Sequence, residues 1–340
     1  MRAYALTHDF PNLNIERSLL SALGVSLIEI NSLESEEWIE QVKDGVALFV
    51  QYSKVDSQMI EQLDHCRIIL RYGIGFDNVD LQAAGKKGIY VCNVPRYCGE
   101  EVAEHTLCLL LAAARRLIPM ANDVQAGEWR FLQHRPIVSL AGKTLGLAGC
   151  GYIAQLVAAR ARAFGMNIIG YDPYMSASQA LHLNIHLVSL EELWERSDMI
   201  SLHVPSTPET YHLINADSLA RMKPDVIIVN TARGSLVDAQ AVRHALDADT
   251  IGGIALDVLE EEPPKGDHPL VHAAGAIVTP HCAYYSEESL PRLQQMAGEE
   301  VVRVLSGNRP QSPVNLKWIN SRFMEEGSSP ESSGTIGGSE

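Results

Sequence analysis

The sequence predicts a two-domain α/β protein in which helices cover parallel sheets. At 340 residues the chain is too long for one small core and is expected to divide into two domains. Short apolar runs alternate with segments of helical period, which is typical of βα repeats around a parallel sheet. These runs fall into two series separated by a long apolar segment, so each series is assigned its own sheet.

The first series of apolar runs is compact and is nearly complete by residue 95. Strands are expected at 2–6, 25–30, 46–51, 67–70 and 89–94, with helices such as 36–42 and 57–63 between them. The second series opens at Thr144 and continues with strands at 167–171, 199–204, 226–230, 253–258 and 276–279. Between the two series, residues 101–117 are apolar on nearly every face, which predicts a helix buried all round at a domain or subunit interface.

The chain is expected to return to the first domain at its end. A helix over about residues 286–305 leads away from His281, and residues 310–316 go back to the first sheet. The predicted domains are therefore 1–98 with 286–318, and 99–285. Residues 319–340 are assigned to a disordered tail. From Ser328 the composition turns to Ser, Gly, Pro and Glu, which bury too little apolar area to offset the entropy of ordering.

Composition and charge argue against several classes of protein. With 46% apolar residues and no apolar run near the roughly eighteen residues that a membrane span needs, no membrane association is expected. The N-terminus carries charge too early for a signal peptide, which predicts a cytoplasmic location. The six cysteines show no paired spacing, so neither a disulfide framework nor a metal site is expected. A formal charge of -15 repels nucleic acid.

A glycine-rich turn opens the second series and predicts a dinucleotide site. Residues 145–148 resemble a strand, Gly149 and Gly151 follow, and helical period begins after them. Gly149 permits a tight turn, Gly151 lets a pyrophosphate approach the main chain, and the helix N-terminus presents unpaired N–H groups. Ala154 occupies the third position of the pattern. Alone the pattern is weak, because many strand-to-helix turns carry glycine for steric reasons.

Asp172 strengthens the prediction of a dinucleotide site. It ends the next apolar run, roughly twenty residues after the glycines, where a carboxylate accepts hydrogen bonds from ribose hydroxyls. The same charge repels a 2′-phosphate, so NAD is expected rather than NADP. The alternative is a helix cap, since Asp172 precedes Pro173 in a sequence that suits a turn.

Further polar residues follow apolar runs, at the sheet edge where parallel sheets bind ligands. Arg233 can grip a carboxylate through two parallel hydrogen bonds, or form an ordinary surface ion pair. His281 by itself is more simply a core histidine, and Glu262 lies in a run of three glutamates that can be a solvated turn. If Glu262 reaches His281, the imidazole stays protonated near neutrality and can donate to a ketone oxygen. Asp257 either binds a nicotinamide carboxamide or caps a turn.

Several ordered segments resemble the D-isomer-specific 2-hydroxyacid dehydrogenase family over about residues 45–315. They are 71–80, 93–95, 102–105, the glycine turn, 230–234, 255–258 with 262–263, and 279–281, in family order and near family spacing. The resemblance implies a Rossmann dinucleotide-binding domain and a flavodoxin-like substrate (lid) domain. It also implies a homodimer built on the helix at 101–117.

The same resemblance implies specific site residues. Arg233, Glu262 and His281 would form the catalytic set, and the backbone of Ile74 and Gly75 would help to hold the substrate carboxylate. The implied NAD contacts are Ile74, Tyr152, Ile153, Asp172, Val204, Thr210, Thr231 and Asp257, beside Gly149 and Gly151. Tyr52 and Tyr284 are expected near the walls of the substrate pocket.

Within the family, segments 73–78, 91–95 and 285–287 are similar to the branch of the C-terminal binding protein corepressors and their bacterial enzyme relatives. Tyr284 replaces a Trp that is frequent in that branch, and Tyr152 replaces the usual Arg of the glycine turn. Gln51 stands where phosphoglycerate dehydrogenases have an Arg for the substrate phosphate. Formate dehydrogenases of this fold usually carry Gln in place of Glu262, so both of those activities are disfavoured.

The sequence therefore predicts an NAD-dependent oxidoreductase that interconverts a small 2-oxo acid and a D-2-hydroxy acid. Arg233 would hold the carboxylate and polarise the carbonyl, His281 would act as general acid or base, and Glu262 would keep His281 charged. Three alternatives remain. They are an NAD-sensing scaffold like the corepressors, a phosphoglycerate dehydrogenase, and a reductase of a substrate without a carboxylate.

Overall fold

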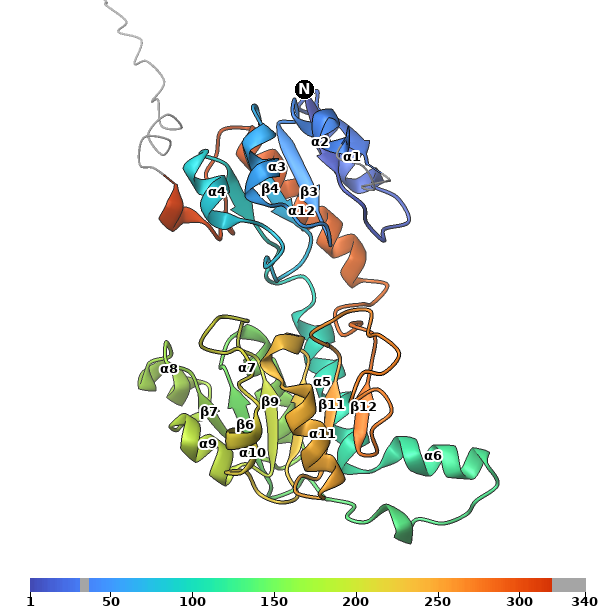
Figure 1. Ribbon diagram of the computed structural model, residues 1–340. Helices are drawn as coiled ribbons and strands as arrows, with labels where there is room; N and C mark the ends of the chain where they lie inside the picture. The colour runs from blue at the N-terminus through green and yellow to red at the C-terminus, as the bar shows by residue number, and fades with distance from the viewer. Residues whose placement is uncertain (31–36, 320–340) are drawn as a thin grey trace, which may run out of the picture. The chain divides into compact units, whose positions relative to one another are not determined.

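The computed structural model describes residues 1–30 and 37–319 and contains two α/β units, each with its own parallel sheet (Figure 1). Unit 1 comprises residues 1–97 and the chain from Ser286 onward, and unit 2 comprises residues 98–285. Of the predicted tail, Ile319 is buried in the structure with 7% of its surface exposed. Residues 320–340 lie outside the described residues.

Unit 1 contains a five-stranded parallel sheet with strand order β2-β1-β3-β4-β5. This order is the flavodoxin-like arrangement. The strands are β1 (Arg2–Ala5), β2 (Ser26–Glu29), β3 (Ala47–Val50), β4 (Ile68–Arg71) and β5 (Tyr90–Cys92). The helices are α1 (Asn14–Ser21), α2 (Glu37–Val42), α3 (Ser57–Gln62), α4 (Leu81–Lys86), α12 (Ser289–Leu305) and the 3₁₀ turn η3 (Leu316–Trp318).

The C-terminal segment of the described chain joins the sheet of unit 1. After α12, the Val314 N–H donates to the Val91 carbonyl at 2.8 Å, and the Val91 N–H donates to the Asn315 side chain at 2.9 Å. Asn315 is fully buried, so these bonds replace water at the edge of β5. The C-terminal residues therefore cover a sheet edge that would otherwise be open.

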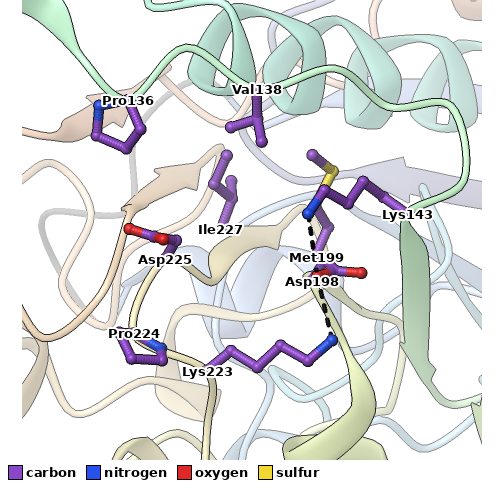
Figure 2. Close-up of a pocket in the computed structure, with 9 residues that line it drawn as sticks. All are labelled: Pro136, Val138, Lys143, Asp198, Met199, Lys223, Pro224, Asp225 and Ile227. Carbon is purple, nitrogen blue, oxygen red and sulfur yellow. Dashed lines mark hydrogen bonds and ion pairs between the residues drawn. The ribbon is translucent and has the colours of Figure 1, made fainter.

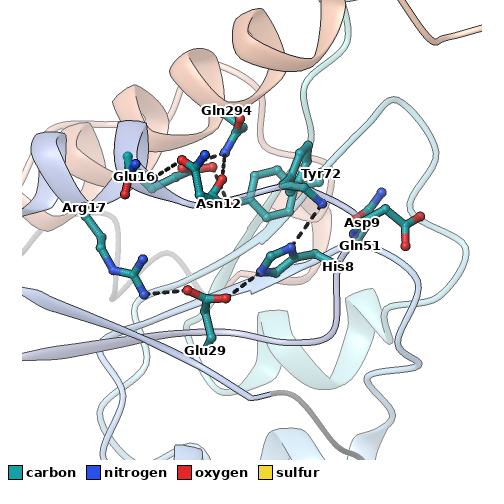
Figure 3. Close-up of polar contacts among 11 residues, drawn as sticks. His8, Asp9, Asn12, Glu16, Arg17, Glu29, Gln51, Tyr72 and Gln294 are labelled. Atoms are coloured by element: carbon teal, nitrogen blue, oxygen red, sulfur yellow. Dashed lines mark hydrogen bonds and ion pairs between the residues drawn. The ribbon is translucent and has the colours of Figure 1, made fainter.

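The carboxyl group of Glu16 on α1 is fully buried in unit 1 (Figure 3). Its oxygens accept hydrogen bonds from the Tyr72 hydroxyl at 2.8 Å and from the Gln294 side-chain amide at 3.0 Å. Burial raises the pKa of Glu16, and these hydrogen bonds offset that effect only in part. Because Tyr72 follows β4 and Gln294 lies on α12, the Glu16 carboxyl connects three elements of the unit.

Unit 2 contains a seven-stranded parallel sheet with strand order β12-β11-β10-β9-β6-β7-β8. Counted from β6, this is the Rossmann order 3-2-1-4-5-6 with one further edge strand. The strands are β6 (Thr144–Ala148), β7 (Asn167–Tyr171), β8 (His186–Leu187), β9 (Met199–Leu202), β10 (Ile227–Asn230), β11 (Gly253–Leu256) and β12 (Ala276–Val278). The helices are α5 (Gly99–Ala114), α6 (Leu117–Gln125), α7 (Tyr152–Ala163), α8 (Ala177–His182), α9 (Leu190–Arg196), α10 (Ala216–Leu219) and α11 (Ala239–Asp247), with 3₁₀ turns η1 (Leu132–His134) and η2 (Gly234–Leu236).

The single helix predicted at 101–117 is wrong in extent. Helix α5 ends at Ala114 because Arg116 adopts a left-handed backbone with φ 52°, and α6 begins at Leu117. Burial on α5 is also incomplete, since Glu104 and Cys108 are exposed. Helix α6 and the segment after it stand away from the rest of unit 2 (Figure 1), and Leu117 is 58% exposed.

Candidate active site

Three neighbouring strands of unit 2 deliver polar residues to one edge of the sheet. Parallel pairing places Asn230 of β10 opposite Leu256 of β11, and Leu256 opposite Val278 of β12. The loops that leave these three strand ends carry Arg233, Glu262 and His281. Carboxyl ends of parallel strands form the ligand-binding edge of doubly wound sheets.

A buried asparagine shapes the loop of Arg233. The Asn230 side-chain amide donates to the Arg233 carbonyl at 2.7 Å, and its oxygen accepts the Ala232 N–H at 2.9 Å. The next residue must be glycine, because a Cβ on Gly234 would lie 1.9 Å from the carbonyl carbon of Leu259. This close backbone approach packs the Arg233 loop directly against the segment that leads to Glu262.

Glu262 and His281 form a hydrogen bond at this edge. Glu262 Oε2 lies 2.6 Å from His281 Nδ1, and Glu262 Oε1 accepts the Leu259 N–H at 2.7 Å. A carboxylate only accepts hydrogen bonds, so Nδ1 carries the proton of this contact and Nε2 is the ring nitrogen that Glu262 does not engage. His281 adopts a left-handed backbone with φ 52°, and its side chain remains 44% exposed. The Tyr284 ring lies edge-on to this imidazole, with centroids 6.3 Å apart.

Asp257 braces the loop that carries His281. It is 1% exposed and accepts hydrogen bonds from the Thr279 hydroxyl at 2.5 Å and from the N–H groups of Cys282 and Ala283 at 3.0 and 2.8 Å. Burial by itself would raise the pKa of Asp257, but hydrogen bonds from His105, Thr279 and these amides lower it to about 2. The local contacts are those of the cap that the sequence left as an alternative.

His105, Asp257 and Cys282 bring three potential metal ligands within 4.8 Å of one another. Their chemistry does not suit a cation. The Asp257 oxygen that faces His105 already accepts N–H and O–H donors, and burial together with Asp257 raises the pKa of the Cys282 thiol. Metals bind the thiolate form, which this environment disfavours.

The glycine turn of unit 2 fits a dinucleotide pyrophosphate. Gly149 has φ 90°, and a Cβ there would lie 2.9 Å from the backbone of His203. A Cβ on Gly151 would meet no heavy atom within 4 Å, and no side chain caps the N-terminus of α7. The N–H groups at this helix end therefore face open space of the kind that a phosphate occupies. Ala154 is fully buried, where the helix packs on the sheet.

Asp172 stands beside the glycine turn and makes local hydrogen bonds to the backbone; it does not cap a helix, since α8 begins at Ala177 with Ser176 as its N-cap. One carboxylate oxygen accepts the Cys150 N–H and the other accepts the Tyr174 N–H, both at 2.9 Å. These bonds hold the turn while the side chain stays partly exposed. The carboxylate is therefore fixed in orientation next to the position that Gly151 leaves open.

The other predicted cofactor contacts in unit 2 differ in their exposure and in the protein groups that they contact. Tyr152 is 38% exposed, and its ring packs against Gly99, where an added Cβ would lie 2.3 Å away. The Thr210 hydroxyl donates to the Pro205 carbonyl at 2.7 Å, and Thr231 Oγ1 lies 2.8 Å from Thr106 Oγ1. Ile153 and Val204 are partly buried against the two cores of this unit.

The remaining predicted residues belong to unit 1. Ile74 and Gly75 follow β4, and the buried Asn93 side chain donates to the Ile74 carbonyl at 2.6 Å. Tyr52 follows β3 and is 55% exposed. Within unit 1 these residues lie beyond the carboxyl ends of neighbouring strands.

Some residues of the site were not singled out from the sequence. His105 Nε2 lies 3.1 Å from Thr279 Oγ1, and Tyr211 and His212 both contact Glu260. His105 belongs to the family-like segment 102–105, so the sequence pointed to this residue but did not indicate what it contacts. Tyr211 and His212 carry no spacing pattern that points to Glu260, since the contact spans 48 residues or more.

A separate cavity of about 250 Å³ lies at the amino ends of β6, β9 and β10 (Figure 2). Asp198 pairs there with Lys143 at 3.5 Å and with Lys223 at 3.1 Å. The amino edge of a parallel sheet is opposite its carboxyl edge, so this cavity is not part of the site around His281.

Comparison with known proteins identifies the family. Residues 107–283 match the model of the D-isomer specific 2-hydroxyacid dehydrogenase, NAD binding domain. The chain belongs to the D-isomer-specific 2-hydroxyacid dehydrogenase family. This membership and the α/β fold class confirm the predictions from sequence. The branch of the C-terminal binding proteins stays a prediction.

Two relatives show how far the likeness extends. The chain is 43% identical over 289 residues to D-3-phosphoglycerate dehydrogenase of Methanocaldococcus jannaschii, covering 84% of this chain and 55% of that protein. It is 39% identical over 289 residues to glyoxylate reductase of Korarchaeum cryptofilum, covering 84% of this chain and 87% of that protein. The chain therefore spans about half the length of the first relative and most of the second.

Solved structures of family members have the same fold. D-lactate dehydrogenase from Aquifex aeolicus, complexed with NAD and lactic acid, aligns with a TM-score of 0.83 at 28% identity, covering 92% of this chain and 99% of that one. A glyoxylate reductase from Paecilomyes thermophila aligns with a TM-score of 0.84 at 30% identity, covering 93% of this chain and 99% of that one.

Proposed function

We propose that this protein is an NAD-dependent D-2-hydroxyacid dehydrogenase that interconverts a small 2-oxo acid and a D-2-hydroxy acid. The observation that carries the proposal is the 2.6 Å contact between Glu262 Oε2 and His281 Nδ1, at the sheet edge that also carries Arg233. An imidazole paired with a carboxylate can exchange a proton, and a guanidinium can hold an organic acid. The activities of the glyoxylate reductase and D-lactate dehydrogenase relatives agree with this chemistry.

The glycine turn and Asp172 would hold NAD. The first-turn N–H groups of α7 would bind the pyrophosphate beside Gly151, and the Asp172 carboxylate would accept bonds from the ribose hydroxyls. Bound NAD supplies the hydride donor or acceptor. Of the other predicted contacts, Val204 and Thr231 follow β9 and β10 at the edge of the sheet that carries His281.

The chain's own residues would handle the carboxylate and the proton. Arg233 binds the substrate carboxylate through two parallel hydrogen bonds and polarises the carbonyl. In reduction His281 Nε2 donates its proton to the carbonyl oxygen, and in oxidation it takes the proton from the hydroxyl. Glu262 holds the Nδ1 proton of the imidazole while Nε2 gives up or takes its proton. Ile74, Gly75, Tyr52 and Tyr284 are proposed to contact the substrate.

The experiment replaces His281 by Asn, a residue that tolerates the left-handed backbone at this position. We expect turnover of 2-oxo acids, followed as NADH absorbance, to fall by about 10²-fold or more, while NADH binding changes little. The exposed His186 on β8 provides the matched control as His186→Asn. Turnover retained by His281→Asn would remove His281 from the mechanism.

Phosphoglycerate oxidation is a second candidate, favoured by the 43% identity to D-3-phosphoglycerate dehydrogenase. Gln51 argues against it. This side chain is 5% exposed and neutral, and its oxygen accepts the Asp9 N–H at 2.9 Å, so it offers a phosphate no charge. Oxidation of 3-phosphoglycerate at a rate above that of unphosphorylated D-2-hydroxy acids would favour the second candidate.

A homodimer is proposed for the assembled enzyme. The apolar side chains of α6 and the following segment support it, because an exposed apolar patch of this kind is typical of protein interfaces. Their exposed fractions are 58% for Leu117, 43% for Ile118, 51% for Val124, 61% for Phe131 and 59% for Leu132. Sedimentation equilibrium of the protein and of Ile118→Glu tests the dimer.

The cytoplasmic location stays a prediction, to be checked by cell fractionation. In the described part of the chain no helix is long and apolar enough to cross a membrane.

A further inference from the structure

Two neighbouring aromatic residues of unit 2 hold the carboxylate of Glu260. The Tyr211 hydroxyl donates to Glu260 Oε1 at 2.9 Å, and His212 Nε2 lies 3.2 Å from Glu260 Oε2. The two rings stack on each other, with centroids 3.9 Å apart and planes inclined by 16°. Each oxygen of one carboxylate thus has its own aromatic partner.

This arrangement depends on an unusual backbone at His212. In an extended chain, successive side chains point to opposite sides, so Tyr211 and His212 would separate. His212 instead has φ 49°, which turns its ring back over the ring of Tyr211. The His212 N–H donates to the Ser235 carbonyl at 2.8 Å, and its carbonyl accepts the Asn215 side-chain amide at 2.9 Å. A left-handed backbone at a non-glycine residue costs free energy and persists where the surroundings enforce it.

Glu260 connects this pair to the proposed catalytic carboxylate. It lies two residues before Glu262, whose Oε1 accepts the Leu259 N–H at 2.7 Å. The backbone at Leu259 and Glu260 also packs directly on Gly234, the residue after Arg233. A shift of Glu260 would therefore move the chain on which the orientation of Glu262 depends.

We propose that Tyr211 and His212 are positioning residues that clamp Glu260 and thereby orient Glu262 against His281. The proposal rests on the proposed function of the Glu262–His281 pair. Neither aromatic residue needs to touch substrate or cofactor for this role. The clamp acts through the segment 259–262, and small displacements of a proton-transfer group reduce turnover strongly.

An ordinary surface contact would behave differently. Exposed ion pairs contribute little to stability, and Glu260 is about half exposed in its side chain, at 46%. If the contact were only of that kind, its removal would leave the Glu262–His281 hydrogen bond and the turnover unchanged. The test must therefore measure that hydrogen bond directly.

The experiment compares Tyr211→Phe, His212→Asn and the double variant with the parent protein. Phe removes only the hydroxyl, and Asn tolerates the left-handed backbone while removing the imidazole. Glu260→Gln is a further variant that removes the charge but leaves both aromatic residues in place. His186→Asn, on an exposed strand of the same unit, is the matched control.

Two readouts do not require activity. The His281 Nδ1 proton, held by Glu262 at 2.6 Å, should give a low-field proton resonance in the parent protein that is lost or broadened in the double variant. Hydrogen exchange at the Leu259 amide should become faster by about fivefold or more when Glu262 no longer accepts its N–H. In kinetics with a 2-oxo acid, kcat should fall by about tenfold with the KM for NADH within twofold.

The outcomes separate the clamp from the proposed function. An unchanged low-field resonance and unchanged Leu259 exchange in both the double variant and Glu260→Gln would overturn the clamp. If the parent protein reduces no 2-oxo acid but both readouts change, the clamp stands and the proposed function falls. Equal changes in His186→Asn would show a general loosening of unit 2 and would overturn the clamp as a specific device.

Discussion

Replacing Asp257 by Asn tests how the loop of His281 is held. The Asp257 Oδ1 atom accepts hydrogen bonds from the Thr279 hydroxyl and the Cys282 N–H, and its Oδ2 atom accepts one from the Ala283 N–H. Asn removes the charge and places an amide NH₂ where one of these donors now points. At least one buried N–H or O–H group then loses its acceptor, which is costly in the absence of water.

The magnitude follows from the pKa of Asp257. The shift of the Asp257 pKa from 3.8 to about 2 corresponds to about 2 kcal/mol of folding free energy. Because Asp257 is 1% exposed, solvent screens its interactions little. We therefore expect Asp257→Asn to lower the free energy of unfolding by about 2 kcal/mol at pH 7. For a unit of this size the midpoint of thermal unfolding should fall by about 4–8 °C.

The pH dependence gives a second expected result. Because the folded-state pKa of Asp257 is lowered, its stabilising effect is present above pH 3.8 and is lost as the pH falls through about 2. Asp257→Asn should lack this loss. Urea unfolding followed by tryptophan fluorescence, to which the buried Trp194 of unit 2 contributes, measures both effects at several pH values between 2 and 7. Equal stability of the two proteins at pH 7, or parallel losses of stability in acid, would refute the reasoning.

Three further predictions concern other positions. Gly149→Ala should destabilise unit 2 and abolish NADH binding, measured by fluorescence. The backbone of Gly149 has φ 90°, and the added Cβ would lie 2.9 Å from the His203 backbone. Normal NADH binding would contradict this prediction. The parent protein should lose stability as the pH rises above 4.5, because burial raises the pKa of Glu16 and the folded state favours its protonated form. Glu16→Gln should lack this loss. Thermal unfolding that depends on pH equally in both proteins would contradict this prediction. Asp172→Ser should lower the preference for NADH over NADPH in kcat/KM by about tenfold, and an unchanged ratio would remove Asp172 from ribose recognition.

The strands and most helices could be predicted from the sequence because each follows a local pattern of apolar residues. Each strand of the two main series is a short apolar run, since parallel strands covered on both faces need apolar side chains throughout. The short β8 was missed, because two residues carry no period, and the break between α5 and α6 was missed because Arg116 is not a residue that marks a left-handed turn. The helix prediction failed where one backbone angle overrode a continuous apolar pattern.

The sequence by itself determined the two parallel sheets, the glycine turn and the placement of Arg233, Glu262 and His281 after strand ends, because these depend on residue type and short spacing. Only the tertiary structure decided that Glu262 Oε2 lies 2.6 Å from His281 Nδ1, and that the Asp257 carboxylate accepts hydrogen bonds from the loop at 279–283. It also decided that Tyr211 and His212 both contact the Glu260 carboxylate. Those contacts join loops that are 19 to 49 residues apart along the chain. Such contacts depend on which strands become neighbours in the sheet, and no local pattern of apolar residues encodes that order.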